Sequence, residues 1–279
     1  MIGGAVLVLM FFTILAKKAQ VLEPIHLVKF FDQQLFSQAV RAQKATASDK
    51  TIKGGIIPHH LLASDLIADF YAHLPPTTKK IFLLGPNHYE AGEFYALTSL
   101  YNWSTPLGTV KADTDIIRTL IAAGVVRVDE KNVVNEHSLG GHLPFIRHYL
   151  PRAKIIPIML KKEGNEDNIK MLVEQIKPYL SQAGVALVAA VDFSHNLPSS
   201  EAAKNDGETL AAMKNFNYQK LFKFGNEHLD SPSSIVALLL AMRSLGIDDL
   251  EVINNTNSAR LLEFDNLETT SYFDIRFRT

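Results

Sequence analysis

The sequence predicts a three-layer α/β domain in which helices cover a mostly parallel central sheet. One observation is a set of short apolar runs, "GGII" at 54–57, "IFLL" at 81–84 and "VALVAAV" at 185–191. Runs rich in Ile, Val and Leu that stop at Pro, Gly or Ser are typical of strands buried on both faces, which belong to parallel sheets. The other observation is helical spacing of apolar residues at 61–74 and 165–180, so strands and helices alternate.

The remaining elements follow in order along the chain. Residues 27–44 read as a helical lead-in, followed by a polar linker at 45–51. Residues 94–113 contain two β-rich pieces around Pro106 and Gly108, which predicts a hairpin with an exposed tip. Helical segments are expected at 200–216, 218–225 and 233–246, and strands at 251–258 and 269–277. We therefore divide the chain into an apolar segment at 1–20, a lead-in and linker at 21–51, and one α/β domain at 52–279.

The N-terminal segment predicts a location. Residues 2–16, "IGGAVLVLMFFTILA", are uncharged and are followed by Lys17 and Lys18. The run is short for a transmembrane helix and resembles the apolar region of a signal peptide, without a basic region before it. We expect an N-terminal membrane anchor or export signal, and the alternative is a buried first helix or strand. The two lysines leave the side of the membrane open.

Composition restricts the chemistry. A net charge of -1 predicts no binding of nucleic acid. The chain has no cysteine, so any metal must be held by His, Asp, Glu or backbone oxygen, a set that suits iron, manganese, zinc or copper. The G-x-G-x-x-G and phosphate-loop patterns are absent, so no nucleotide cofactor is expected, and no G-x-S-x-G elbow predicts a serine hydrolase.

Polar residues follow three of the predicted strands. His59 and His60 come after the first, Asn87 and His88 after the second, and Asp192 and His195 after the third. Because ligands bind outside the carboxyl ends of the strands in open sheets of this kind, these residues are candidates for one site.

The same motifs carry a resemblance to a known family. "IIPHH", "LLGPNH", "EHSLGGHLPF", "VDFSH" and the late "NNTNS" occur in the order and approximate spacing of the Memo-like family, the B component of the AmmeMemoRadiSam system, over residues 52 to 279. The resemblance implies a fold like that of the class III extradiol (LigB-type) dioxygenases, which hold a non-haem iron with two histidines and a carboxylate. It implies metal-binding roles for His59 and His88 and proton transfer for His195.

The third metal position departs from the family, in which it is typically a cysteine before a helix. Here that region reads "HLDSPSSIVALLLA", and Asp230 is the nearest replacement. The set His59, His88 and Asp230 would then be two imidazoles and one carboxylate, the arrangement of Fe(II) oxygenases. Gly140 and Gly141 are a second departure, because the family often has another acidic residue there.

The functional hypotheses that follow come from three classes. The first is a metal-dependent enzyme with dioxygenase-like redox chemistry at iron or copper on a small substrate. The second is a metal-binding protein without turnover, and the third is a peptide- or protein-binding module. The resemblance implies AMMECR-type and radical SAM proteins as partners. Zinc hydrolysis is a further alternative, because two histidines and a carboxylate also bind zinc.

Several residues have a second interpretation. Asp230 or Ser231 would serve as a helix N-cap before Pro232, and Asp192 would bond loop amides. Glu136 and His137, in the "EHS" motif, would either line the pocket or cap a helix.

Three other histidines are weaker candidates for the site. His60 is an alternative to His59 as a ligand, although local packing or hydrogen bonding is the ordinary role. His142 and His148 have poor ligand spacing relative to His137 on a helix, so we expect them on the surface or behind the site.

Overall fold

The computed structural model describes residues 24–43, 48–162, 164–264 and 268–279. Its centre is a sheet in the order β1-β5-β6-β8-β3-β9-β2-β11-β10, with the short strands β4 and β7 beside β8. The bounds of the strands are β1 Ile25–Leu27, β2 Ile52–Ile57, β3 Lys80–Pro86, β4 Ala96–Thr98, β5 Asn102–Thr105, β6 Gly108–Ala112, β7 Arg127–Val128, β8 Lys154–Leu160, β9 Val185–Ala190, β10 Glu251–Asn257 and β11 Ser271–Arg278.

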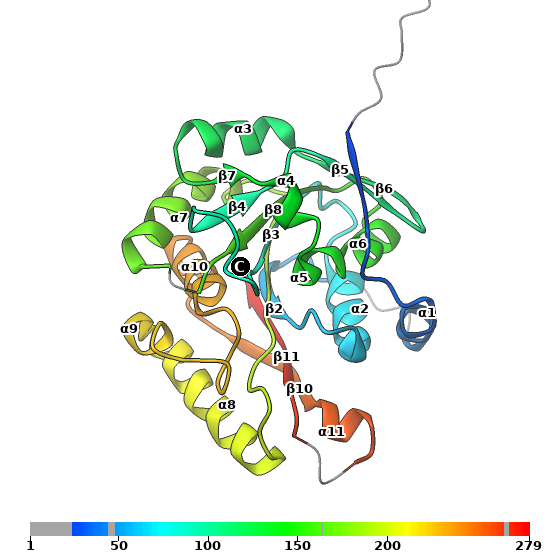
Figure 1. The fold of residues 1–279 in the computed structure, drawn as a ribbon, viewed down its shortest axis with the longest axis vertical. Coiled ribbons are helices and arrows are strands. Elements are labelled where there is room, and N and C mark those ends of the chain that lie inside the picture. The colour runs from blue at the N-terminus through cyan, green and yellow to red at the C-terminus, as the bar shows by residue number, and fades with distance from the viewer. Residues whose placement is uncertain (1–23, 44–47, 163, 265–267) are drawn as a thin grey trace, which may run out of the picture.

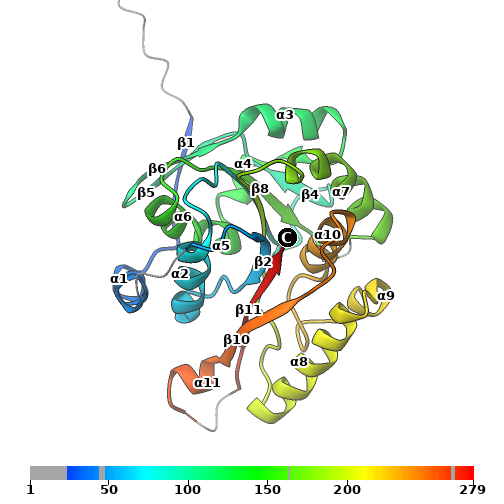
Figure 2. The same cartoon turned by 180° about the vertical axis from the view of Figure 1, so that it is seen from behind.

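Helices lie on both faces of this sheet, so the expected three-layer α/β fold is confirmed. Helices α3 (Thr114–Ala122), α7 (Glu166–Leu180) and α10 (Pro232–Ser244) pack on one face. Helices α1 (Gln33–Ala42), α2 (Ser64–His73), α5 (His137–Gly140) and α6 (Leu143–Tyr149) cover the other. Figure 2 shows the same layers from behind, with the two helical groups still on opposite sides of the strands.

The remaining helices are short or peripheral. They are η1 Leu61–Ala63, α4 Glu130–Val133, α8 Ser199–Lys214, α9 Tyr218–Leu221 and α11 Ser258–Leu261. Helices α8 and α9 extend along one side of the molecule, and α11 lies beyond β10 and β11 (Figure 1).

The central strands are parallel because each crossover passes through a helix. β8, β3, β9 and β2 are neighbours and run in the same direction. Nearly all their residues are buried, as continuous apolar runs require when helices cover both faces. β11 and β10 extend the sheet in antiparallel fashion beyond β2, and the predicted hairpin at 94–113 appears as β5 and β6.

The lead-in differs from the prediction. Residues 25–27 form β1, a strand that pairs in parallel with β5, whereas the sequence predicted no strand in the lead-in at 21–51. Its side chains alternate exposed, buried, exposed, which is the pattern of a strand, but three residues are too few to reveal that period in the sequence. The predicted helix is limited to α1, which begins at the N-cap Asp32 and packs on α2.

The apolar N-terminal segment lies outside the described residues. Among the residues that are described, no helix combines the length and the apolar character needed to cross a membrane.

Candidate metal centre

The candidate site is built where three neighbouring parallel strands end. His59 follows β2, His88 follows β3, and Asp192 and His195 follow β9, the strand between the other two. Because parallel neighbours in register end at the same edge, these side chains meet. Asp230 lies two residues before the start of α10, and its side chain meets these residues at the same edge.

Asp230 is the point on which the histidines converge. Its Oδ2 atom lies 3.4 Å from His59 Nε2, 3.7 Å from His88 Nε2 and 4.0 Å from His195 Nε2. The other carboxylate oxygen, Oδ1, is buried and has no hydrogen-bond partner among the described residues. The N-cap of α10 is Ser231, whose hydroxyl accepts from the backbone N–H of Ser234, so Asp230 is not used as a cap.

His59 is buried and held in one orientation. Its Nδ1 lies 3.2 Å from the carbonyl oxygen of Ala190, to which it donates as the neutral tautomer. Nε2 therefore presents its lone pair to the carboxylates of Asp192, at 3.5 Å, and Asp230. Burial lowers the pKa of His59 to about 3, against the opposing charge of Asp230. The imidazole is thus neutral, as a metal ligand must be.

Asp192 supports this arrangement from behind. Its Oδ1 accepts a hydrogen bond from the backbone N–H of His59 at 3.0 Å, and its own backbone N–H donates to Asp230 Oδ2 at 3.4 Å. Burial raises the pKa of Asp192. Asp192 therefore both bonds a loop amide and lies among the candidate metal donors.

His88 is oriented by Glu136. Nδ1 of His88 donates to Glu136 Oε1 at 2.8 Å, which turns Nε2 toward Asp230. Burial opposes charge on His88, but its hydrogen bonds to Asp230 and Glu136 and the charges of both carboxylates prevail and raise its pKa to about 10. Burial alone would raise the pKa of Glu136, whereas the hydrogen bond and charge of His88 lower it to about 2.

Glu136 fulfils both interpretations of the "EHS" motif, and His137 fulfils one. Glu136 is the N-cap of α5 and accepts from the backbone N–H of Ser138 at 2.9 Å while it holds His88. The ring of His137 stacks on His88 with centroids 4.2 Å apart, and burial together with the charge of His88 lowers the pKa of His137. His137 therefore belongs to the site.

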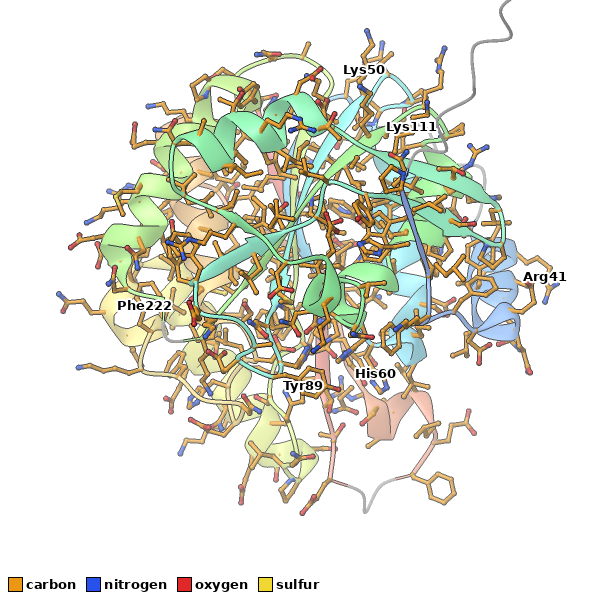
Figure 3. All side chains as sticks on the ribbon, turned by 45° about the horizontal axis from the view of Figure 1, so that its top comes forward. Arg41, Lys50, His60, Tyr89, Lys111 and Phe222 are labelled. Carbon is orange, nitrogen blue, oxygen red and sulfur yellow. The ribbon has the colours of Figure 1, made fainter. Side chains whose placement is uncertain are left out.

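Other predicted residues lie at its margin or outside it. The amide group of Asn87 bonds the backbone of Ala91 as donor and as acceptor, so Asn87 shapes the loop that carries His88. His60 is exposed (Figure 3) and pairs through Nδ1 with the hydroxyl of Tyr272, whereas His59 is buried. His148 is exposed, and His142 is fully buried behind the site with Nδ1 3.1 Å from Tyr71 Oη, so each takes one of the two expected places.

The donors present could hold a metal ion. Potential ligand atoms form two overlapping groups that share His59, namely His59 with His88 and His137, and His59 with Asp192 and Asp230. The His59 and His88 Nε2 atoms lie 3.4 and 3.7 Å from Asp230 Oδ2, so each histidine could share an ion with Asp230. The neutral His59 ring presents its lone pair to two carboxylates, and Asp230 Oδ1 is buried without a partner among the described residues. A cation between these groups would satisfy both.

Sequence reasoning did not identify two supporting contacts. The carbonyl of Ala190, at the last residue of β9, fixes the His59 tautomer, and the Tyr272 hydroxyl in β11 holds His60 away from the donors. A backbone carbonyl has no signature in a sequence. Tyr272 lies within the predicted strand 269–277, but only the antiparallel register of β11 brings it near the site.

Comparison with known proteins shows the family of the chain. The family model described as Memo-like protein matches residues 29–275, nearly the whole described domain. The chain belongs to the Memo-like family. The predicted family is therefore confirmed, and with it the α/β fold related to that of the extradiol dioxygenases.

Individual relatives are distant in sequence. A MEMO1 family protein from Methanothermobacter thermautotrophicus is 26% identical over 226 residues, which are 77% of this chain and 80% of the relative. A MEMO1 family protein from Aquifex aeolicus is 27% identical over 74% of this chain and 79% of its own length. The crystal structure of an uncharacterized protein from Escherichia coli K12 is similar with a TM-score of 0.52 and 10% identity, covering 80% of this chain and 99% of that one.

Proposed function

We propose that the chain binds a transition-metal ion through His59, His88 and Asp230 and supports redox chemistry on a small chelating substrate. The observation that carries the proposal is the convergence of these two imidazoles on one buried carboxylate whose second oxygen has no partner among the described residues. Iron or copper suits this nitrogen and oxygen donor set, which contains no thiolate. Such an ion would supply one-electron chemistry and open coordination positions.

The remaining residues have distinct tasks in this proposal. His59 and Asp230 form the buried wall, with side chains 2% and 3% exposed, and exclude water from the donors. His88 and His195 form the open side, at 24% and 20%, where a substrate enters. His195 lies outside the ligand set and is placed to accept and return a proton, because histidine does so near neutral pH. Glu136 keeps the His88 Nε2 atom aimed at the donors.

Metal content tests the proposal. The full chain would be purified without oxygen and compared with His59→Ala, His88→Ala and Asp230→Ala by elemental mass spectrometry. The exposed His148 gives the matched control His148→Ala, which should keep its metal. Iron or copper near one ion per chain, lost in all three site variants, would establish the ligands and justify oxygen-uptake assays with catechol-like substrates. Metal retained in the site variants would refute the proposed ligand set.

A binding function is the second candidate, and one observation favours it. Tyr89, next to His88, is 75% exposed at the open side of the site, and exposed aromatic side chains commonly anchor protein partners. In this version the chain is a non-catalytic metal-binding or peptide-binding module that works with AMMECR-type and radical SAM proteins. Tyr89→Ala would then weaken capture of a partner and leave the metal content unchanged. If the chain is an enzyme instead, Tyr89→Ala should leave partner capture unchanged and alter the affinity for substrate.

A further inference from the structure

The edge of the sheet opposite the candidate metal centre is rich in positive charge. Three cavities open there, the first of about 600 Å³. They are neighbours, because Thr77 and Thr78 line two of them and Lys154 lines another pair. Six exposed cationic residues line these cavities: Lys50, Lys79, Lys111, Arg118, Arg152 and Lys154. We refer to these six residues as the basic edge.

Little negative charge offsets the basic edge. Of the carboxylates that line the same cavities, Asp113 is buried and paired with the half-buried Lys80 at 3.5 Å. Asp115 is exposed, and the terminal residue Thr279 lines the second cavity. No ion pair joins any basic-edge side chain to another described residue. Six unpaired cations therefore meet solvent together, on a chain whose overall net charge is only -1.

The N-terminal part of the chain arrives at this same edge. Pro24 lines the third cavity, and its carbonyl accepts from the backbone N–H of Asn102 at 3.1 Å. The next strand, β1, exposes two apolar side chains, Ile25 at 45% and Leu27 at 68%. Seven residues lie between Ala16, the last residue of the uncharged stretch 2–16, and Pro24, and a fully extended chain of that length spans about 28 Å at most.

The candidate metal centre points the other way. The basic edge includes Lys79 and Lys154, at the amino ends of β3 and β8, whereas His59 and His88 follow the carboxyl ends of β2 and β3. Figure 3 shows the separation: Lys50 and Lys111 lie at the top of the view, and His60 and Tyr89 lie at the bottom.

We propose that the basic edge docks on the anionic headgroups of a lipid bilayer, beside the point where the apolar N-terminal segment enters it. Phosphate-bearing headgroups match unpaired Lys and Arg, and Ile25 and Leu27 meet the boundary with the acyl chains. The apolar sequence at 2–16 favours a bilayer over a soluble polyanion, because a bilayer offers apolar material beside its anionic headgroups. The bound domain would present its histidine cluster to water.

Vesicle partitioning of the full chain tests the proposal. The edge variant carries Lys79→Gln, Lys111→Gln and Lys154→Gln. The matched control carries Lys204→Gln, Lys214→Gln and Lys223→Gln, which remove the same charge from exposed lysines in and near α8 and α9.

The measured quantity is the ratio of partitioning into phosphatidylcholine vesicles with and without phosphatidylglycerol. Each cation near an anionic surface changes partitioning by about fivefold, so the ratio should fall about a hundredfold in the edge variant and little in the control. An equal fall in both variants, or none in the edge variant, would overturn the proposal. Binding of inorganic tripolyphosphate that is lost in the edge variant, without preference for anionic vesicles, would assign the edge to a soluble anion instead.

A second measurement reports orientation and does not depend on affinity. Because the chain has no cysteine, Thr119→Cys at the first cavity and Tyr89→Cys at the metal centre each give one labelling position for a fluorophore. With the full chain on anionic vesicles, a quencher on the lipid headgroup should quench the label at position 119 and leave the label at 89 bright. Equal quenching of both labels, or the reverse order, would refute the docking geometry.

Discussion

Metal binding should release a proton from His88, and Glu136 should set the average number of protons released per ion at a given pH. In the metal-free protein, the pKa of His88 is raised to about 10, since Asp230 and Glu136 outweigh the effect of burial. His88 Nε2 must lose its proton to bind an ion, so below about pH 10 the proton competes with the metal. The affinity should therefore rise about tenfold for each pH unit between about pH 6.5 and 8.5, which corresponds to about 1.4 kcal/mol per unit.

His59 and Glu136 contribute little to this release over that range. The pKa of His59 is lowered to about 3, so His59 is already neutral, and Glu136, at about 2, remains charged. Glu136→Gln removes one of the two carboxylates that raise the His88 pKa. The variant should therefore release clearly less than one proton from His88 at about pH 8.5, and its affinity should depend less on pH.

Calorimetry measures both quantities. Titrations with Zn²⁺, a redox-silent probe, in buffers of different ionisation enthalpy count the protons released per ion. Glu130→Gln is the matched control, because Glu130 accepts from His26 Nε2 at 2.7 Å in a similar pair outside the site. Wild type and Glu130→Gln should agree and Glu136→Gln should differ. Equal proton release in all three proteins would refute the assigned role of His88 and Glu136.

Two further predictions concern stability. Gly55→Ala should lower the free energy of unfolding in urea by about 1–3 kcal/mol, because an added Cβ would lie 2.2 Å from Phe70 Cε2. Gly207→Ala, in open space within α8, should raise the free energy of unfolding by about 0.5–1 kcal/mol. A stabilising Gly55→Ala would contradict the packing. Burial lowers the pKa of His142 to about 3, below the unfolded value near 6.5, so its contribution is present above about pH 6.5 and is lost as the pH falls toward 3. His142→Leu should therefore reduce the slope of unfolding free energy against pH by about 1.4 kcal/mol per pH unit in that window. Loss of the bond to Tyr71 changes the free energy of unfolding but not this slope. An unchanged slope would contradict a neutral His142.

The sequence predicts the framework of the site because it depends on strand ends. Apolar runs locate β2, β3 and β9, and the parallel arrangement then brings His59, His88 and Asp192 to one edge without any knowledge of side-chain contacts. The sequence left open whether Asp230 is a candidate metal ligand or the N-cap of the following helix. The observed geometry decides the cap, because Ser231 takes that role.

Features that depend on tertiary packing were beyond the sequence. His142 was expected on the surface or behind the site, and its spacing along the chain could not decide between the two. The ring lies behind the site, fully buried against Tyr71 and close enough to His59 for the two charges to interact. The sequence offered two roles for Glu136, capping a helix or lining the site, and the structure shows that it does both. The three residues of β1 become a strand only because β5 offers a partner.

The most direct test of the central claim is whether Asp230 coordinates the metal. Since the chain contains no cysteine, Asp230→Cys introduces the only thiolate, and Asp115→Cys, at an exposed position, is the matched control. After loading with Co²⁺, Asp230→Cys should show a thiolate-to-cobalt charge-transfer absorption that wild type and Asp115→Cys lack. Cobalt bound by Asp230→Cys at one ion per chain without that absorption would show that position 230 is not a ligand.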